Sequence, residues 1–243
     1  MCFHLSLLRD YRELEQRFES RFDEPASYKP FYYEEAFSTP RSPVITDAAP
    51  DSIRMLEWGL IPRWVKSEPD AAQIRMGTFN ARSDSVFSKA SFRSSIMDRR
   101  CLVLADGFFE WHEHKGKKYP YYIRLKSRQA FALAGLWESW TALGPAKETF
   151  SIITTDANPL MAQIHNVKKR MPVILRREDE QRWLQKGLTA GQVSALLKPY
   201  DEGDMEAYTI SRLITSRTED RNVPKLLEPH EYKELGSQQR SLF

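Results

Sequence analysis

Two rhythms of apolar and polar residues run along this chain, and they predict a domain built from both helices and strands. Near the N-terminus, Asp10 and Glu13 have the spacing of a capping pair at the start of a helix. Apolar side chains then recur at helical spacing, at Tyr11, Leu14, Phe18 and Phe22. This pattern predicts an amphipathic helix whose apolar stripe packs against the core.

The middle of the chain is dense in short β-branched and aromatic runs, which are typical of strands. The segment from Lys115 to Lys118 contains Gly116 and predicts a hairpin turn between two of them. The runs cover residues 101–105, 108–111, 119–125, 131–137 and 150–154, and residues 208–210 predict a last strand.

Helical patterns return in the second half of the chain. Asn158 followed by Pro159 predicts an N-cap and a first helical position, with His165 at the end of a short helix. Residues 178–186 and 192–197 are also helical by pattern.

Residues 25–50 form a different kind of segment, rich in Pro, Ser and aromatic residues. Such a composition predicts an irregular connection wrapped on the body of the domain, with a short strand at Val44 and Ile45. We expect one domain over residues 1–230, followed by a polar tail over residues 231–243.

Composition adds bounds on the environment of the protein. The 243 residues include 36 Lys and Arg against 33 Asp and Glu, a net charge of +3 that permits nucleic-acid binding without demanding it. Two cysteines are too few for a disulfide framework and fit a reducing compartment, and Cys101 starts an apolar run typical of a buried thiol. No segment approaches the roughly 20 apolar residues of a membrane span, so we expect a cytoplasmic protein without a membrane partner.

Cys2 is the first candidate for chemistry, because removal of Met1 turns it into an N-terminal aminothiol. An α-amine has a reference pKa of about 7.7–8.0, against about 10.4 for lysine, so more of it is neutral near pH 7. Such an amine condenses with an aldehyde to a Schiff base, and the neighbouring thiol can then close a thiazolidine ring. From position alone, an incidental small residue is the alternative interpretation.

Four later segments extend this candidate. They are Trp58-Gly59-Leu60-Ile61-Pro62-Arg63-Trp64, Asn80-Ala81-Arg82, Asp106-Gly107-Phe108-Phe109-Glu110-Trp111, and Ile164-His165 with Arg170-Met171-Pro172-Val173-Ile174-Leu175. Together with Cys2, and in this order, they resemble the SRAP family, the SOS-response-associated peptidases that shield abasic sites in single-stranded DNA by covalent crosslinking. The resemblance implies a single α/β (α+β) domain rich in antiparallel strands with peripheral helices. It also implies that single-stranded DNA with abasic sites is the partner, that the protein is a monomer, and that no cofactor or metal is needed.

The resemblance gives catalytic roles to Cys2, Asn80, Glu110 and His165. Glu110 acts near the amine and His165 near the sugar ring oxygen, since the closed hemiacetal of an abasic site must open before an amine attacks. Asn80 holds the amine or the sugar by hydrogen bonds. Without the motif, Glu110 is a surface acid, Asn80 a turn residue and His165 a structural histidine.

The candidate DNA-binding residues combine cations with one exposed ring. Arginine suits phosphate because of its fixed fork of donors, and an exposed tryptophan can stack beside an unpaired base. A solvated loop is the alternative for the basic run, and a core position is the alternative for the tryptophan; for Trp58 the core is preferred. The candidates are Arg82, Trp64, His4, Lys168, Lys169 and Arg170.

The chain also departs from the family pattern. Cys2 is usually followed by Gly and Arg, whereas this chain has Phe3 and His4, so phosphate binding is expected to be weaker or to depend on the protonation of His4. The family's Asn-x-Ala-Pro segment is replaced by Glu35-Ala36-Phe37-Ser38-Thr39-Pro40, and the second aromatic of the tryptophan loop is Val65. Between His165 and Arg170 this chain has two residues more than the common spacing in the family.

Three functions remain open from the sequence. The first is covalent capture of abasic sites, the second is a cysteine peptidase or self-processing hydrolase that uses Cys2 with His165, and the third is a noncovalent single-stranded-DNA-binding module. The sequence contains no signature of an oxyanion hole or peptide pocket, which favours the first over the second.

Overall fold

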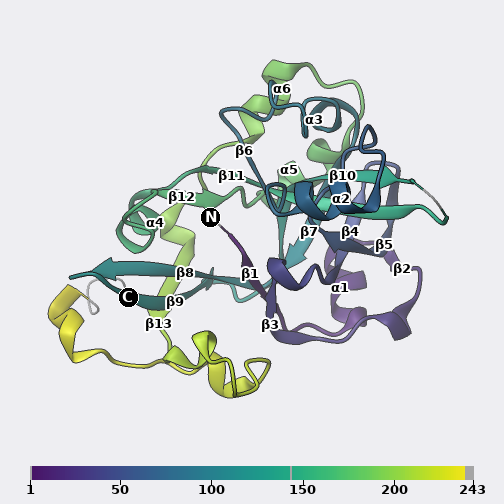
Figure 1. Ribbon diagram of the computed structural model, residues 1–243. Helices are drawn as coiled ribbons and strands as arrows, with labels where there is room; N and C mark the ends of the chain where they lie inside the picture. The colour runs from purple at the N-terminus through teal and green to yellow at the C-terminus, as the bar shows by residue number, and fades with distance from the viewer. Residues whose placement is uncertain (1, 143, 239–243) are drawn as a thin grey trace.

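The computed structural model describes residues 2–142 and 144–238, and it consists of two β-sheets with short helices around them (Figure 1). The first sheet has five strands in the order β13-β9-β8-β1-β3, and every neighbouring pair is antiparallel. Its strands are β1 (His4–Leu7), β3 (Phe31–Glu35), β8 (Gly107–His114), β9 (Lys117–Leu125) and β13 (Met205–Thr209).

The second sheet has eight strands and closes on itself. Its order is β12-β11-β10-β7-β4-β5-β2, with β6 paired to β11. Because β11 also pairs with β5 in parallel, the strands β11, β10, β7, β4 and β5 form a closed ring. The strands are β2 (Arg21–Phe22), β4 (Arg41–Thr46), β5 (Ala49–Trp58), β6 (Asn80–Arg82), β7 (Arg100–Ala105), β10 (Phe131–Trp140), β11 (Lys147–Asp156) and β12 (Arg170–Pro172).

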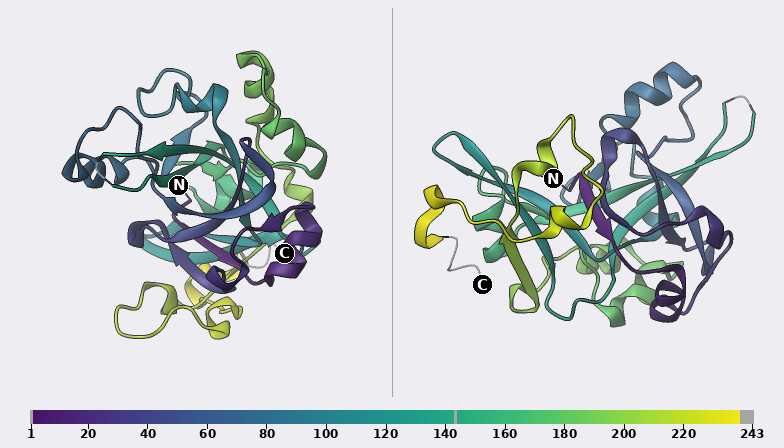
Figure 2. Two further views of the ribbon diagram at one scale, coloured as in Figure 1. Left: turned by 90° about the vertical axis from the view of Figure 1, so that its right-hand side faces the viewer. Right: turned by 90° about the horizontal axis from the view of Figure 1, so that it is seen from below.

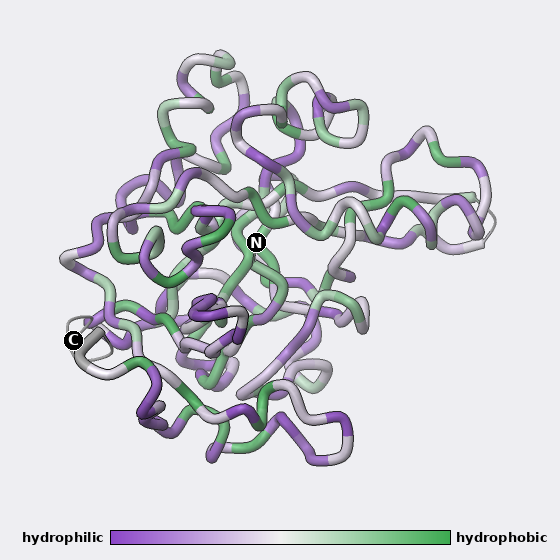
Figure 3. The backbone as a smooth tube through the Cα atoms, turned by 60° about the vertical axis from the view of Figure 1, so that its left-hand side comes forward, coloured by the Kyte–Doolittle hydropathy of each residue, from purple (hydrophilic) through white to green (hydrophobic). Residues whose placement is uncertain are grey.

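The core lies in and between these strands. All six residues of β7 are buried, since this strand is covered on both faces. In Figure 3 the hydrophobic residues are concentrated in the central strands, including the N-terminal strand, while the outer loops are mostly hydrophilic. The N-terminal strand β1 is therefore part of the core and not a loose end.

The helices are short and lie on the outside of the sheets (Figures 1 and 2). The α-helices are α1 (Tyr11–Phe18), α2 (Glu68–Arg75), α3 (Ser95–Asp98), α4 (Pro159–Ile164), α5 (Arg177–Leu184) and α6 (Ala190–Leu196). Short 3₁₀ helices are η1 (Pro25–Ser27), η2 (Ala36–Ser38), η3 (Glu202–Asp204), η4 (Arg212–Thr215), η5 (Pro224–Leu227) and η6 (Lys233–Gln238). None of the described helices is long and apolar enough to span a bilayer.

The predicted α/β fold with antiparallel strands is confirmed, and the local signals explain why. The capping box of Asp10 and Glu13 is present at α1, and Asn158 caps α4 by accepting the Met161 N–H at 2.8 Å. The predicted hairpin turn joins β8 to β9 through Lys115 and Gly116, whose φ values are 49° and 73°. The predicted strands and later helices are all present, with ends shifted by a few residues.

Two sequence-based predictions need correction. Residues 25–50 are not an irregular connection, because they contain β3, β4 and the start of β5, and only the strand predicted at Val44 and Ile45 is confirmed, as part of β4. The hydrogen-bonding partners of β3 and of β4 include β1 and β7, which are distant in sequence, so local composition gave no sign of them. Phe22 lies in β2 and not in the first helix, since Glu19 ends that helix in a left-handed conformation with φ 54°.

The segment predicted to be a polar tail contacts the domain as far as it is described. Tyr232 is buried, packs edge-on against Tyr119 and donates its hydroxyl to the Ile210 carbonyl at 2.8 Å. Leu235 is buried in the same cluster. Residues 239–243 of the predicted tail lie outside the described residues. The described part of the C-terminal segment, yellow in Figures 1 and 2, lies beside the five-stranded sheet.

Candidate active site

The N-terminal strand is held in place by hydrogen bonds from Asp106, which lies between β7 and β8. Its carboxylate accepts the Leu8 N–H at 2.5 Å and the Ser6 hydroxyl at 2.8 Å. In the antiparallel pairing of β1 with β8, Leu5 lies opposite Phe108. Residues before Leu5 therefore run beside residues after Phe108, which brings Cys2 toward Glu110.

Gly107 makes this close pairing possible. A Cβ atom at this position would lie 2.2 Å from the Tyr122 hydroxyl oxygen, so no other residue fits without moving the ring. The same hydroxyl lies 2.9 Å from the Ser6 hydroxyl. The Asp-Gly pair that begins the 106–111 motif thus fixes the direction in which the N-terminus enters the site.

Cys2 itself is fully buried, with 0% of its surface exposed. Its Sγ lies 4.0 Å from the His4 carbonyl oxygen. Burial raises the pKa of the thiol well above its usual range, and the negative charge of Glu110 raises it further. The sulfur is therefore a protonated thiol near neutral pH.

Glu110 is buried as well, with 3% of its surface exposed. It lies on β8 opposite Tyr121 of β9, so its carboxyl is covered by the sheet and by α4. Burial raises the pKa of Glu110 to about 7. A carboxyl with this pKa can give or take a proton in the neutral range.

His165 faces Glu110 from the C-terminal end of α4, with its Nε2 at 3.9 Å from the Glu110 Oε2. Its Nδ1 lies 2.9 Å from the Arg170 carbonyl oxygen, which accepts a hydrogen bond when Nδ1 carries the proton. That tautomer leaves a lone pair on Nε2, directed at Glu110. Burial lowers the pKa of His165 to about 4, so near neutral pH the pair holds its proton on Glu110.

Asn80 approaches from the other sheet, on β6. It is 9% exposed, and within the described residues neither atom of its amide has a hydrogen-bond partner. A buried amide without partners costs free energy, since its hydrogen bonds to water are lost. Such a group is typical of a binding site that a ligand completes.

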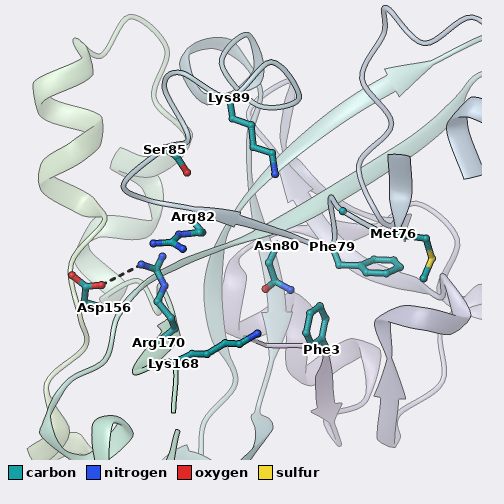
Figure 4. A pocket seen from close by; sticks show the side chains of 11 residues that line it. Phe3, Met76, Phe79, Asn80, Arg82, Ser85, Lys89, Asp156, Lys168 and Arg170 are labelled. Carbon is teal, nitrogen blue, oxygen red and sulfur yellow. Dashed lines mark hydrogen bonds and ion pairs between the residues drawn. The ribbon is translucent and has the colours of Figure 1, made fainter. Parts of the chain in front are cut away.

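Two pockets lie on either side of Phe3 and Lys168, which line both. The proton-transfer pocket, of about 360 Å³, is also lined by His4, Glu110, Trp111 and His165. The basic pocket, of about 620 Å³, is also lined by Met76, Phe79, Asn80, Arg82, Lys89 and Arg170 (Figure 4). Glu110 and His165 therefore lie at the first pocket and Asn80 at the second, whereas Cys2 is buried near Glu110 and belongs to the lining of neither.

The candidate DNA-binding residues are distributed unevenly. Arg82 and Lys168 are exposed at the basic pocket, although Arg82 is paired with Asp84. Trp64 is 51% exposed, and both Trp64 and Lys169 lie outside the lining of the two pockets.

Two other candidates have surroundings that the sequence did not reveal. Arg170 is buried and bonds to Asp156 at 3.1 Å and to the Thr154 carbonyl at 2.7 Å, so it supports the pocket wall from within. His4 stacks on Tyr33, and burial lowers its pKa to about 4. Burial therefore favours the neutral form of His4, and the expected contact of His4 with phosphate stays a prediction.

Several residues at the site were not predicted from sequence. Lys89 and Met76 line the basic pocket, and Asp106 positions β1. Lys89 and Met76 lie in segments without a recognisable motif, whereas Asp106 belonged to the matching motif and only its role was missed. Among the described residues, no group of three or more His, Cys, Asp or Glu side chains is arranged to hold a metal ion.

The chain is similar to several known proteins. The model of the family "SOS response associated peptidase (SRAP)" matches residues 1–217. Abasic site processing protein YoqW of Bacillus subtilis is 39% identical over 234 residues, which cover 95% of this chain and 100% of that protein. Abasic site processing protein HMCES of Mus musculus is 30% identical over 264 residues, which cover 90% of this chain and 72% of that protein.

Solved structures show the same fold. A crystal structure of a protein from Bacteroides thetaiotaomicron superposes with a TM-score of 0.89 at 39% identity, covering 95% of this chain and 100% of that one. One from Bordetella bronchiseptica has a TM-score of 0.73 at 23% identity, covering 86% of this chain and 100% of that one.

Proposed function

Because the chain belongs to the SOS response associated peptidase (SRAP) family, we propose that it captures abasic sites in single-stranded DNA through a covalent bond to Cys2, once Met1 is removed. Two of its relatives are named abasic site processing proteins. The observation that carries the proposal is the buried group of Cys2, Glu110 and His165, of which the last two line the proton-transfer pocket.

The first step is opening of the deoxyribose ring, which needs a proton acceptor at the hemiacetal hydroxyl and a proton donor at the ring oxygen. Near neutral pH, the pKa order makes Glu110 the donor and His165 the acceptor. The two side chains lie 3.9 Å apart, so they can also exchange the roles of donor and acceptor. His165 can then act at the ring oxygen, as the family resemblance implies.

The second step joins the aldehyde to the N-terminus. The α-amine of Cys2 adds to the aldehyde carbon, and loss of one water gives a Schiff base. Glu110 carries both amine protons to the carbonyl oxygen in turn, one during the addition, which forms the hydroxyl, and one as that hydroxyl leaves as water. The thiol of Cys2 then adds to the imine carbon, its proton moves to the nitrogen, and a five-membered thiazolidine results. Asn80 offers its unpartnered amide to the sugar or the amine.

This order of events fits the raised pKa of the thiol. A cysteine peptidase needs a thiolate, which a neighbouring imidazolium normally stabilises. Here burial raises the pKa of the Cys2 thiol, and the lowered pKa of His165 leaves no imidazolium that could stabilise a thiolate, so the site opposes thiolate formation. The amine is therefore the first nucleophile, and the sulfur acts after the imine has formed.

Denaturing gel electrophoresis with single-stranded oligonucleotides tests the proposal. Protein that begins at Cys2 by intact mass should form a denaturation-resistant adduct with an abasic oligonucleotide and none with the matched intact one. Cys2→Ala should give only a short-lived adduct that borohydride traps, since it keeps the amine and lacks the sulfur. An uncleavable residue ahead of Cys2 should abolish both products.

Each result has a defined meaning. No adduct from verified protein refutes covalent capture, and binding without any adduct favours a noncovalent module. An adduct from the extended protein, formed through its thiol, refutes the amine-first order.

A further inference from the structure

Two departures of this chain from the family pattern meet in space. Phe3 follows Cys2, and Phe37 lies in the segment that replaces the usual Asn-x-Ala-Pro. Their ring centroids are 5.2 Å apart, and Phe79 completes the group at 6.4 Å from Phe3 and 5.4 Å from Phe37. Three rings from separate parts of the chain therefore form one aromatic cluster beside the nucleophile.

The cluster has a buried base and an exposed upper part. Phe79 is 1% exposed, whereas Phe37 is 52% exposed and the nearby pocket residue Met76 is 60% exposed. Large apolar side chains at such exposure cost free energy in water unless a partner covers them. Met76 lines the basic pocket itself, and the exposed Phe37 ring packs against the pocket residues Phe3 and Phe79, so the cluster presents rings and a thioether beside that pocket.

The base of the cluster is rigid. The Phe79 carbonyl accepts a hydrogen bond from the Trp58 indole N–H at 2.9 Å. Gly59 has a φ of 110°, and a Cβ atom there would lie 3.0 Å from the Phe79 ring. The backbone turn at Gly59 thus lets the chain pass directly against the ring and fixes its position.

The opposite side of the pocket is polar and cationic. Figure 4 shows Phe3, Phe79 and Met76 on one side, Arg82 on the other, and Asn80 between them. Lys89 and Lys168 line the same pocket. An apolar, aromatic side facing a cationic one is complementary to a nucleotide, whose base stacks while its phosphate seeks positive charge.

We propose that Phe3, Phe37, Phe79 and Met76 form a stacking platform for the unpaired nucleobase next to the abasic site. This inference rests on the proposed function for the location of the lesion at Cys2. Loss of a base leaves its neighbour without a stacking partner on one face, and the platform supplies that face. Purines present a larger ring surface than pyrimidines, so the platform prefers a purine at this position.

The experiment measures noncovalent binding, separately from crosslinking. Single-stranded oligonucleotides carry one tetrahydrofuran site, which mimics an abasic sugar but cannot open. The nucleotide on its 5′ side or its 3′ side is adenine, cytosine or a second tetrahydrofuran, and affinity is measured by fluorescence anisotropy. On one of the two sides, adenine should increase affinity about tenfold over the second tetrahydrofuran, with cytosine between them.

The variants separate the platform from general apolar contact. Phe37→Ala should reduce the adenine preference to within about twofold, whereas Phe37→Tyr should retain it, because stacking needs a ring. Phe37 is half exposed, so its removal leaves the core intact. Leu8→Ala, which removes another exposed apolar side chain, is the control and should change nothing.

The outcomes distinguish this inference from the proposed function. A wild-type protein without neighbour preference, or a preference that survives Phe37→Ala, overturns the platform even if abasic DNA is crosslinked normally. A preference that Phe37→Ala removes supports the platform even if wild-type protein forms no crosslink, in which case only the covalent function fails.

Discussion

The proton-transfer pocket and the basic pocket share the walls Phe3 and Lys168 and differ in almost everything else. The first contains two buried ionisable groups, Glu110 and His165. Burial raises the pKa of Glu110 to about 7 and lowers the pKa of His165 to about 4, so the usual order of the two is reversed. The second contains cations such as Arg82 on an exposed surface with an apolar side. Under the proposed function, this difference predicts that reaction and DNA binding use separate groups and that mutation can separate them.

The largest effect is expected from removing the acid of the first pocket. Glu110→Gln cannot exchange a proton, so the crosslinking rate at saturating protein should fall by about 10²–10⁴, the usual contribution of general acid–base catalysis. Noncovalent affinity for the same DNA should change less than twofold. Single-turnover crosslinking and anisotropy measure the two quantities.

A matched control lies close by. Glu113 is an exposed carboxylate three residues further along β8, and Glu113→Gln should leave the rate unchanged. Equal losses in the two variants, or a Glu110→Gln variant that binds weakly but reacts at the normal rate once bound, would break the division between the pockets.

Burial of Glu110 should also be visible in stability. A carboxyl with a reference pKa near 4.5 and a folded pKa of about 7 holds more protons folded than unfolded, so its contribution to stability decreases as pH rises through this window. Glu110→Gln lacks that cost. The variant should match wild type near pH 4.5 and exceed it by up to about 3 kcal/mol above pH 7, as measured by urea unfolding. Equal stability at pH 8 would mean that the carboxyl is not desolvated.

The smallest effects are expected from the basic pocket. Lys89→Ala should lower affinity for single-stranded DNA several-fold and reduce the slope of log affinity against log salt by about 0.7, since one phosphate contact is lost. Arg82→Ala should lower affinity less, because Asp84 already competes for its guanidinium. Lys126→Ala, an exposed cation outside both pockets, should leave the slope unchanged. If Lys89→Ala also lowered the crosslinking rate at saturating protein, the basic pocket would contribute to the reaction and the division between the pockets would be wrong.

Local signals made much of the fold predictable. The caps at Asp10 and Asn158 and the turn at Gly116 act within a few residues, and the structure contains all three. Within residues 25–50 only the strand at Val44 and Ile45 was predicted, and β3 was missed because its partner strand β1 lies outside the segment. Composition describes a segment and not the neighbours that complete its hydrogen bonds.

The site shows the same boundary. The order of the motifs identified Cys2, Glu110 and His165 as candidates, and these three residues lie close together in the structure. The order of the motifs could not show that Arg170 is buried whereas Lys168 is exposed, because burial depends on the pairing of β12 with β11 and not on the basic run itself. Nor could it show that Phe3 and Phe37 touch, since each looked like an isolated departure.

Ring closure between β5 and β11 has a consequence for how molecules of this protein meet each other. An open sheet of long strands exposes unpaired backbone groups at its edges, and these can recruit another chain. Here the ends of the eight-stranded sheet are β2, with two residues, and β12, which has three residues and contains Pro172. At the β3 edge of the five-stranded sheet, the side-chain oxygen of Asn222 accepts the N–H groups of Tyr32 and Tyr33. These three edges offer little backbone for sheet-to-sheet aggregation between molecules.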